Sequence, residues 1–230
     1  MESKKKYNSE LIKISDNWEL NYIDVDNNWS ATASNYGWCY GSGTVNDPYI
    51  IENVTISYGS GIKIHNTKEY FIVRKCTIVN IPDMNLHRID GIYLKNVTNG
   101  ILLNNNCSLN PGNGIYLENC SNNKVLNNYA SFNCDPGIYL SKSSFNNISS
   151  NIITDNSGGA EWMGMSLFNS HYNTIFNNSF YSNEEKGIGL YSSNKNSIIY
   201  NTIDSSNLEL ILSIIVIQIT LQTILLKIVI

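Results

Sequence analysis

The stretch that decides the fold runs from Gly114 to Asn128 and reads GIYLENCSNNKVLNN. Its opening tetrad, Gly-Ile-Tyr-Leu, returns along the chain in related forms that begin at Gly61, Gly91, Gly114, Gly137, Gly164 and Gly187. The steps between these glycines are 30, 23, 23, 27 and 23 residues. A period in this range is typical of stacked repeats, in which one unit cannot bury its apolar face alone. The sequence therefore predicts a solenoid.

Alignment of the repeats on this glycine gives three apolar columns, at one, three and eleven residues after it. They contain Ile62, Ile92, Ile115, Ile138, Met165 and Ile188; Ile64, Leu94, Leu117, Leu140, Leu167 and Leu190; and Ile72, Leu102, Val125, Ile148, Ile175 and Ile198. Apolar residues at i and i+2 follow the period of a strand, and no helical spacing fits. Each coil is expected to carry at least two short strands, stacked in parallel on the next coil about 4.7 Å away.

Asparagine fills a further column, fourteen residues after the glycine. It contains Asn105, Asn128, Asn151, Asn178 and Asn201, with Asn53 and Lys75 at the matching place in the first two coils. Asparagine tolerates left-handed backbone, and its amide can bond to the same amide in the coils above and below. We interpret the column as a structural ladder rather than a ligand site. A weaker ladder is predicted nine residues after the glycine, at Asn123, Asn146, Asn173 and Asn196.

These coils, together with the segments Gly41 to Thr44 and Asp47 to Asn53, resemble a known family over about residues 36 to 207. The chain resembles right-handed parallel β-helix proteins of the pectin-lyase-like superfold, and more closely the group with NosD-like β-helix repeats. The resemblance implies an all-β, single-stranded solenoid of about seven coils and an extracellular or cell-surface location. It transfers function poorly, because this superfold includes lyases, hydrolases, epimerases, adhesins and scaffolds.

Composition and charge limit the possible partners. The chain has 230 residues, of which 42% are hydrophobic and 15% charged, as expected of one elongated domain. Its net charge of −4 gives no reason to expect nucleic acid. We expect residues 1–35, with Trp18 and Trp29, to cap the open end of the repeats in 36–207. The basic run at residues 4–6 precedes no apolar stretch, so we expect no signal peptide in the chain as it stands.

Cysteine and histidine give no metal motif. The odd number of cysteines and the absence of CxxC spacing argue against zinc and against a closed disulfide framework, so buried thiols are expected at Cys39, Cys76, Cys107, Cys120 and Cys134. His65, His87 and His171 share no ligand spacing, so the copper-related role that the NosD resemblance implies has no predicted site. We expect no cofactor apart from calcium.

The last stretch, residues 208–230, loses asparagine and becomes rich in isoleucine and leucine. Residues 210–230 are long enough to span a bilayer, so a membrane anchor is one interpretation. The other is a reading-frame slip near residue 208, because the tail begins where the next glycine is due and a shifted frame of AT-rich codons can encode another coil. A membrane partner is expected only if the tail is real.

Acidic and aromatic residues gather just before the glycines of the tetrads. The two repeats that are longer than 23 residues carry their additional residues at this point, on one edge of the solenoid. We expect Arg88, Asp90, Asp135, Glu161 and Trp162 on this edge, beside Asp83, His87, Glu184 and Glu185. Carboxylates spaced by coils can act as acid and base on a glycosidic bond or bind calcium, and a tryptophan can stack on a sugar. The alternative is a solvated acidic rim.

Tyr93, Tyr116 and Tyr139 stand between the two inward residues of three successive tetrads, so they are expected to point outward. A flat strip of tyrosines can accept a glycan chain, and the same residues can equally form a stabilising cross-strand ladder. Lys95 and Glu118 beside them are expected to form an exposed ion pair of small value.

From these features we favour a noncatalytic surface or secreted β-helix that binds a polysaccharide or other glycan. A carbohydrate-active enzyme, namely a lyase, hydrolase or epimerase, is the second hypothesis, and a purely structural scaffold is the third. A lyase needs a basic side chain beside the proton that it abstracts, and of the two arginines, Arg74 and Arg88, only Arg88 is expected on the acidic edge. The Gly-His-Gly motif of polygalacturonases is absent from the sequence. Binding is assigned to Tyr93, Tyr116, Tyr139 and Trp162 with Arg88, Asp90, Asp135 and Glu161, and catalytic residues are left unassigned.

Overall fold

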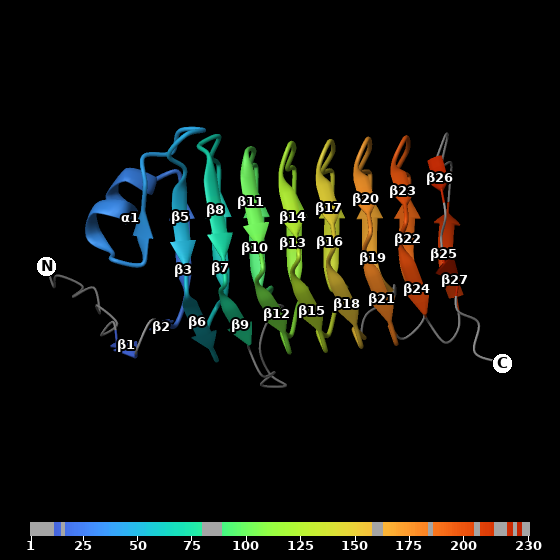
Figure 1. Ribbon diagram of the computed structural model, residues 1–230, viewed down its shortest axis with the longest axis horizontal. Coiled ribbons are helices and arrows are strands. Elements are labelled where there is room, and N and C mark those ends of the chain that lie inside the picture. The colour runs from blue at the N-terminus through green and yellow to red at the C-terminus, as the bar shows by residue number, and fades with distance from the viewer. Residues whose placement is uncertain are drawn as a thin grey trace, which may run out of the picture.

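In a computed structural model, the protein is a β-solenoid whose stacked coils form three sheets around a core (Figure 1). Residues 12–14, 17–79, 89–157, 163–183, 186–204, 208–213, 220–222 and 225–226 are described. Each regular coil passes once through each sheet, so neighbours in a sheet come from successive coils. The predicted all-β parallel solenoid is confirmed, and its right-handed winding stays a prediction.

The first sheet has eight strands: β3 (Ile23–Asp26), β7 (Ile62–His65), β10 (Ile92–Lys95), β13 (Ile115–Glu118), β16 (Ile138–Ser141), β19 (Met163–Phe168), β22 (Lys186–Tyr191) and β25 (Leu208–Ser213). The second has nine: β4 (Cys39–Tyr40), β5 (Tyr49–Glu52), β8 (Phe71–Arg74), β11 (Gly100–Leu103), β14 (Lys124–Leu126), β17 (Asn147–Ser149), β20 (Thr174–Phe176), β23 (Ser197–Ile199) and β26 (Thr220–Gln222). The third has ten: β1 (Ile12–Ile14), β2 (Asn17–Leu20), β6 (Val54–Ser57), β9 (Thr77–Val79), β12 (Asn106–Ser108), β15 (Tyr129–Ser131), β18 (Ile152–Thr154), β21 (Ser179–Tyr181), β24 (Thr202–Asp204) and β27 (Leu225–Leu226).

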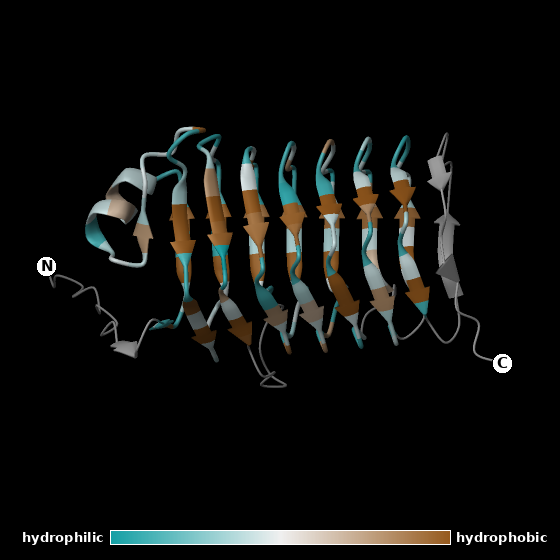
Figure 2. Cartoon of the chain, viewed as in Figure 1, coloured by the Kyte–Doolittle hydropathy of each residue, from teal (hydrophilic) through white to brown (hydrophobic). Residues whose placement is uncertain are grey.

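The apolar columns form the core between the sheets, and Figure 2 shows hydrophobic strands joined by hydrophilic turns. The inward residues of β10, β13 and β16 have no solvent exposure: Ile92, Leu94, Ile115, Leu117, Ile138 and Leu140. Their parallel register, with Ile92 beside Ile115 and Ile115 beside Ile138, is the predicted one. The third strand of each coil adds a column that the sequence did not mark clearly, since Cys107, Ala130 and Ile153 differ in size and hydropathy.

The glycine of the tetrad is required by close approach of neighbouring coils. A Cβ added at Gly114 would lie 2.6 Å from the carbonyl oxygen of Gly137 and 2.9 Å from Nδ2 of Asn133. A Cβ added at Gly91 would likewise lie 2.5 Å from the carbonyl oxygen of Gly114 and 2.9 Å from Nδ2 of Asn110. Backbone atoms of the next coil leave no room for a methyl group, which explains why this position repeats along the chain.

Both predicted asparagine ladders are confirmed. Asn128 donates through its backbone N–H and its Nδ2 to Oδ1 of Asn151, at 2.8 and 3.0 Å, and Asn151 repeats this pattern with Asn178. The ladder of Asn123, Asn146, Asn173 and Asn196 is built alike. A third ladder, not predicted, contains Asn110, Asn133, Asn156 and Asn183. Buried side-chain amides thus join neighbouring coils at three turns.

Two details of the predicted columns are wrong. The left-handed residue of the second turn precedes the ladder residue, so Asn104, Asn127 and Lys75 have positive φ where Asn105 and Asn128 do not. Ile72 faces outward beside Ile101, and Val73 takes the inward place beside Leu102. The misplacement of Ile72 and of Lys75 in the coil that begins at Gly61 has one cause, because one extra residue lies between its tetrad and its second strand and shifts the alternation by one.

At the N-terminal end, β2 and β3 add strands to the third and first sheets, and helix α1 (Trp29–Asn35) follows them. Trp29 is buried and stacks on Tyr49 and Phe71, with ring centroids 5.1 and 5.0 Å apart, while its Nε1 donates to Thr67. Aromatic rings therefore fill the core beside α1. The division into a cap at 1–35 and repeats at 36–207 stays a prediction.

Four cysteines, Cys39, Cys76, Cys107 and Cys120, are buried free thiols, as predicted, and burial raises the pKa of the Cys76 thiol to about 12. Cys134 departs from the prediction, since it is exposed in the turn before Gly137. Burial alternates along this turn, in which Asn133 and Asp135 are buried while Phe132 and Cys134 are exposed.

The tail predicted as an anchor or a frame slip continues the solenoid where the structure describes it. Strands β25, β26 and β27 pair in parallel with β22, β23 and β24, with Leu210 beside Ile188 and Leu212 beside Leu190. No helix in the described ranges is long and apolar enough to cross a membrane. The frame slip stays a prediction, which the nucleotide sequence tests.

Candidate functional site

Three tyrosines form a stacked row on the outer face of the first sheet. Tyr93, Tyr116 and Tyr139 lie in register on β10, β13 and β16, between inward residues. Their ring centroids are 5.0 Å apart at both steps, with interplanar angles of 20° and 18°. We call these three residues the tyrosine ladder. The prediction that they point outward is confirmed, and all three are half-buried.

Stacking changes how this ladder can meet a ligand. Rings that lie face to face along the sheet cover one another's faces, so the ladder presents mainly ring edges and hydroxyl groups. Each side chain follows the strand spacing and stacks on its neighbour, as in the predicted cross-strand ladder, and acceptance of a glycan by the strip stays a prediction. Any ligand along this row meets a narrow amphipathic ridge.

Charged groups flank the ladder. The Tyr93 hydroxyl donates to Oε2 of Glu118, and Nζ of Lys95 lies 3.2 Å from Oε1 of the same carboxylate, which confirms the predicted ion pair. The hydrogen bond from Tyr93 lowers the pKa of Glu118, against the opposing effect of burial, and Lys95 lowers it further. The ring of His65 on β7 makes a T-shaped contact with the ring of Tyr93, with centroids 5.7 Å apart. The ridge thus carries an ionised carboxylate held by two neighbours.

The tyrosines themselves resist ionisation. Burial is the main cause that raises the pKa of Tyr116 to about 12, followed by the negative charge of Glu118. Burial and the hydrogen bond to Glu118 raise the pKa of Tyr93 above its ordinary range. Both rings therefore remain neutral hydrogen-bonding groups at physiological pH.

The raised pKa of Tyr116 predicts a loss of stability at high pH. An unfolded tyrosine ionises near pH 10.0 and the folded one near 12, so between these values the unfolded chain binds fewer protons and unfolding is favoured as pH rises. Buried thiols titrate over the same range, so the informative quantity is the difference between the protein and Tyr116→Phe. We expect the variant to lose less stability than the unchanged protein between pH 10 and 12 in urea denaturation. Equal losses would contradict the pKa assignment.

The predicted acidic edge is only partly within the described residues. Asp90 lies in the turn before β10, and its charge helps raise the pKa of both Tyr93 and Tyr116, so it belongs with the ladder. Its Oδ1 accepts from the backbone N–H and the Nδ2 of Asn113, both at 2.8 Å. Asp135 lies in the corresponding turn before β16 and is 7% exposed. Burial raises the pKa of the neighbouring Cys134 thiol, and the charge of Asp135 raises it further. The other residues predicted for this edge lie outside the described residues: Asp83, His87, Arg88, Glu161, Trp162, Glu184 and Glu185.

Sequence reasoning missed a second aromatic pair, in the turns between the first and second sheets. Phe145 and Tyr172 stack at 4.8 Å with an interplanar angle of 4°, and Nζ of Lys195 lies 5.0 Å from the Tyr172 centroid. Both aromatics have positive φ, which is uncommon for large side chains. Their shared place, eight residues after the glycine, is the signal that could have revealed them.

Residues 8–186 match the family described as periplasmic copper-binding protein (NosD). The chain belongs to the NosD family. No curated protein sequence matches the chain.

Solved structures share the fold of this NosD-family chain at low identity. A mutant of the periplasmic alginate epimerase AlgG matches with a TM-score of 0.68 and 17% identity, over 77% of this chain and 45% of that one. The Dettilon tailspike protein gp208 has a TM-score of 0.54 and 18% identity, over 70% and 37%. The A-module of the Azotobacter vinelandii mannuronan C-5 epimerase AlgE6 has a TM-score of 0.52 and 12% identity, over 77% and 64%. The chain thus spans less than two thirds of each of these proteins.

The described residues of this NosD-family chain do not fit a copper site. Within the described ranges, no three His, Cys, Asp or Glu side chains come together so as to hold a metal ion. Burial raises the pKa of the thiols of Cys39, Cys76 and Cys120 to about 12, which disfavours the thiolate that binds metal. The described residues thus supply no ligand set for the copper of the family description.

Proposed function

We propose that the protein is a noncatalytic β-helix that binds a glycan chain along the tyrosine ladder. The observation that carries this proposal is the 5.0 Å repeat of phenol rings on the outer face of the first sheet. This repeat is close to the advance per sugar of a β-1,4-linked pyranose chain, so a chain parallel to the solenoid axis would place one sugar at each coil.

The chemistry of the ridge suits a polyhydroxylated ligand. Ring edges offer apolar contact, while the phenol groups, Glu118 and Lys95 offer donors and acceptors to sugar hydroxyls. The fold likeness to alginate epimerases is consistent with a glycan partner. The family description and AlgG are both periplasmic, which supports a periplasmic or extracellular location. Calcium is proposed only as an accessory to the acidic edge at Asp90 and Asp135.

A glycan array with and without added calcium tests the proposal. We expect the intact chain to bind a defined set of linear polysaccharides and to leave them unmodified. An array with no bound glycan in either condition would contradict the function, and binding that needs calcium would assign the acidic edge a part in it.

A carbohydrate-active enzyme is the second candidate, favoured by the fold likeness to epimerases. A glycosidic acid catalyst needs a carboxyl group with a raised pKa. The pKa values of Glu118 and Glu52 are instead lowered, chiefly by hydrogen bonds from Tyr93 and Arg74 respectively. New reducing ends, unsaturated sugars or changed epimers after incubation with an array-selected glycan would favour the enzyme over the binder.

A further inference from the structure

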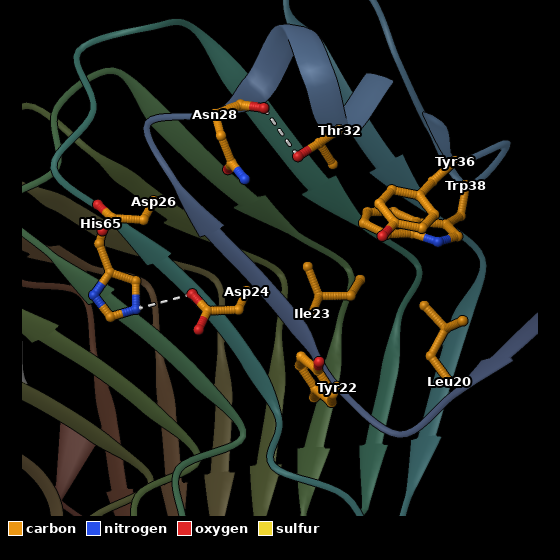
Figure 3. A pocket seen from close by; sticks show the side chains of 10 residues that line it. All are labelled: Leu20, Tyr22, Ile23, Asp24, Asp26, Asn28, Thr32, Tyr36, Trp38 and His65. Atoms are coloured by element: carbon orange, nitrogen blue, oxygen red, sulfur yellow. Dashed lines mark hydrogen bonds and ion pairs between the residues drawn. The ribbon is translucent and has the colours of Figure 1, made fainter. Parts of the chain in front are cut away.

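A pocket of about 460 Å³ lies beside the outermost strand of the first sheet, between β3 and the segment that follows α1 (Figure 3). Figure 3 shows Asp24, Asp26 and His65 on one side of it and the stacked rings of Tyr36 and Trp38 on the other. Those two rings have centroids 5.0 Å apart and an interplanar angle of 17°. The volume is within the range of small-molecule sites.

Strand β3 presents backbone groups to this pocket. The backbone N–H of Ile23 donates to the carbonyl oxygen of Gly61, and the backbone N–H of Asn27 donates to the carbonyl oxygen of His65. Alternate residues along β3 therefore direct their backbone groups toward β7. In a parallel pair the residues between them point their N–H and C=O groups the other way. The backbone N–H and C=O groups of Asp24 and Asp26 therefore point away from β7 at the edge of the sheet, while their carboxylates project from its outer face.

A buried donor also marks the pocket. Trp38 lines it and is 6% exposed, yet its Nε1 has no hydrogen-bond partner among the described residues. Buried polar groups nearly always have a partner, because leaving a donor unsatisfied is costly. An acceptor supplied by a ligand would satisfy this indole N–H.

The charge of the pocket selects against anions. Asp24 and Asp26 line it, and Lys and Arg are absent from its lining. One oxygen of Asp26 accepts from Nδ2 of Asn66, and Nε2 of His65 lies 3.5 Å from Oδ1 of Asp24. No metal-binding group of three such side chains is present in the described ranges. The remaining carboxylate oxygens are suited to accept hydrogen bonds from neutral hydroxyl groups.

We propose that this pocket binds the terminal sugar of a neutral glycan chain. The carboxylates of Asp24 and Asp26 accept from neighbouring hydroxyls, Nε1 of Trp38 donates to a sugar oxygen, and the Tyr36 ring gives apolar contact. The edge contact between His65 and Tyr93 joins the pocket to the tyrosine ladder, so one chain reaches both. That the ligand is a sugar rests on the proposed function, whereas its neutrality and its bound end rest on the pocket.

Paired oligosaccharides that differ only in charge test the inference. Isothermal titration of the intact chain would compare β-1,4-mannohexaose with hexamannuronate, and the hexaoses of glucose and galactose with their hexauronates. We expect the tightest neutral hexaose to bind at least tenfold more tightly than its uronate. Trp38→Phe keeps the ring and removes the N–H, and we expect it to weaken that neutral ligand at least tenfold. Asp24→Asn with Asp26→Asn should reduce the preference for the neutral ligand.

Asp47→Asn is the matched control, since this exposed carboxylate lies outside the pocket, and it should leave both affinities unchanged. Melting curves establish that the variants fold. If glycans bind and the ladder variant loses them, but Trp38→Phe and the double Asp variant bind like the unchanged protein, the pocket inference is wrong and the proposed function stands. If no oligosaccharide or array glycan binds, both fail together. Tighter binding of uronates would also overturn the inference.

Discussion

Asn151→Leu is expected to lower the free energy of unfolding by about 3 kcal/mol. In the protein, Oδ1 of Asn151 accepts from the backbone N–H and the Nδ2 of Asn128, at 2.8 and 3.0 Å, and both asparagines are almost fully buried. Leucine cannot accept these bonds. Two buried donors would then lose their partner, and each such loss costs roughly 1–3 kcal/mol.

Urea denaturation of the intact chain measures this loss. Thr174→Leu is the matched control, because it makes a similar polar-to-apolar change at an exposed outward position of β20 and should alter stability by less than about 0.5 kcal/mol. Equal stabilities for Asn151→Leu and the unchanged protein would refute the structural interpretation of the ladder. Asn128→Leu should behave like Asn151→Leu, because Asn128 has the same contacts one coil earlier.

Replacement of Tyr93, Tyr116 and Tyr139 by serine is expected to abolish glycan binding while the fold is kept. The change removes all three rungs of the ridge, but none of the three rings belongs to the core between the sheets. Binding of the array-selected glycan by titration and the melting temperature would be measured on the same sample. Replacement by phenylalanine separates two contributions, since it keeps the stack and removes the hydroxyls.

Tyr129, Tyr181 and Tyr200 provide the control for this triple change. They are exposed tyrosines outside the first sheet, and their replacement by serine should leave binding intact. Retained binding in the ladder variant, with loss on substitution of Asp135 and Glu161, would instead place the site at the acidic edge and favour the enzyme.

The sequence predicted the regular coils well because each column is under the same physical constraint in every coil. Glycine recurs where a Cβ would meet the backbone of the next coil, and apolar residues recur where two sheets enclose the core. The prediction failed at Ile72, where one extra residue breaks the register, and it did not mark the third strand, where Cys107 and Ala130 obscure the alternation.

Less of the candidate site could be predicted. Outward orientation of the tyrosine ladder follows from the two-residue period, but the ring stacking that covers its faces depends on side-chain conformation. No sequence pattern predicted the pocket, because Trp38 and Asp24 lie before the regular repeats. They line one pocket because β3 is the edge strand of the first sheet. A periodic analysis detects constraints that repeat, and this pocket occurs once.

A crystal structure of the protein with the tightest array-selected oligosaccharide tests the central claim most directly. We predict that the chain lies across β10, β13 and β16, with successive sugars beside Tyr93, Tyr116 and Tyr139. An oligosaccharide bound on the second or third sheet, with the tyrosine ladder uncovered, would contradict the account.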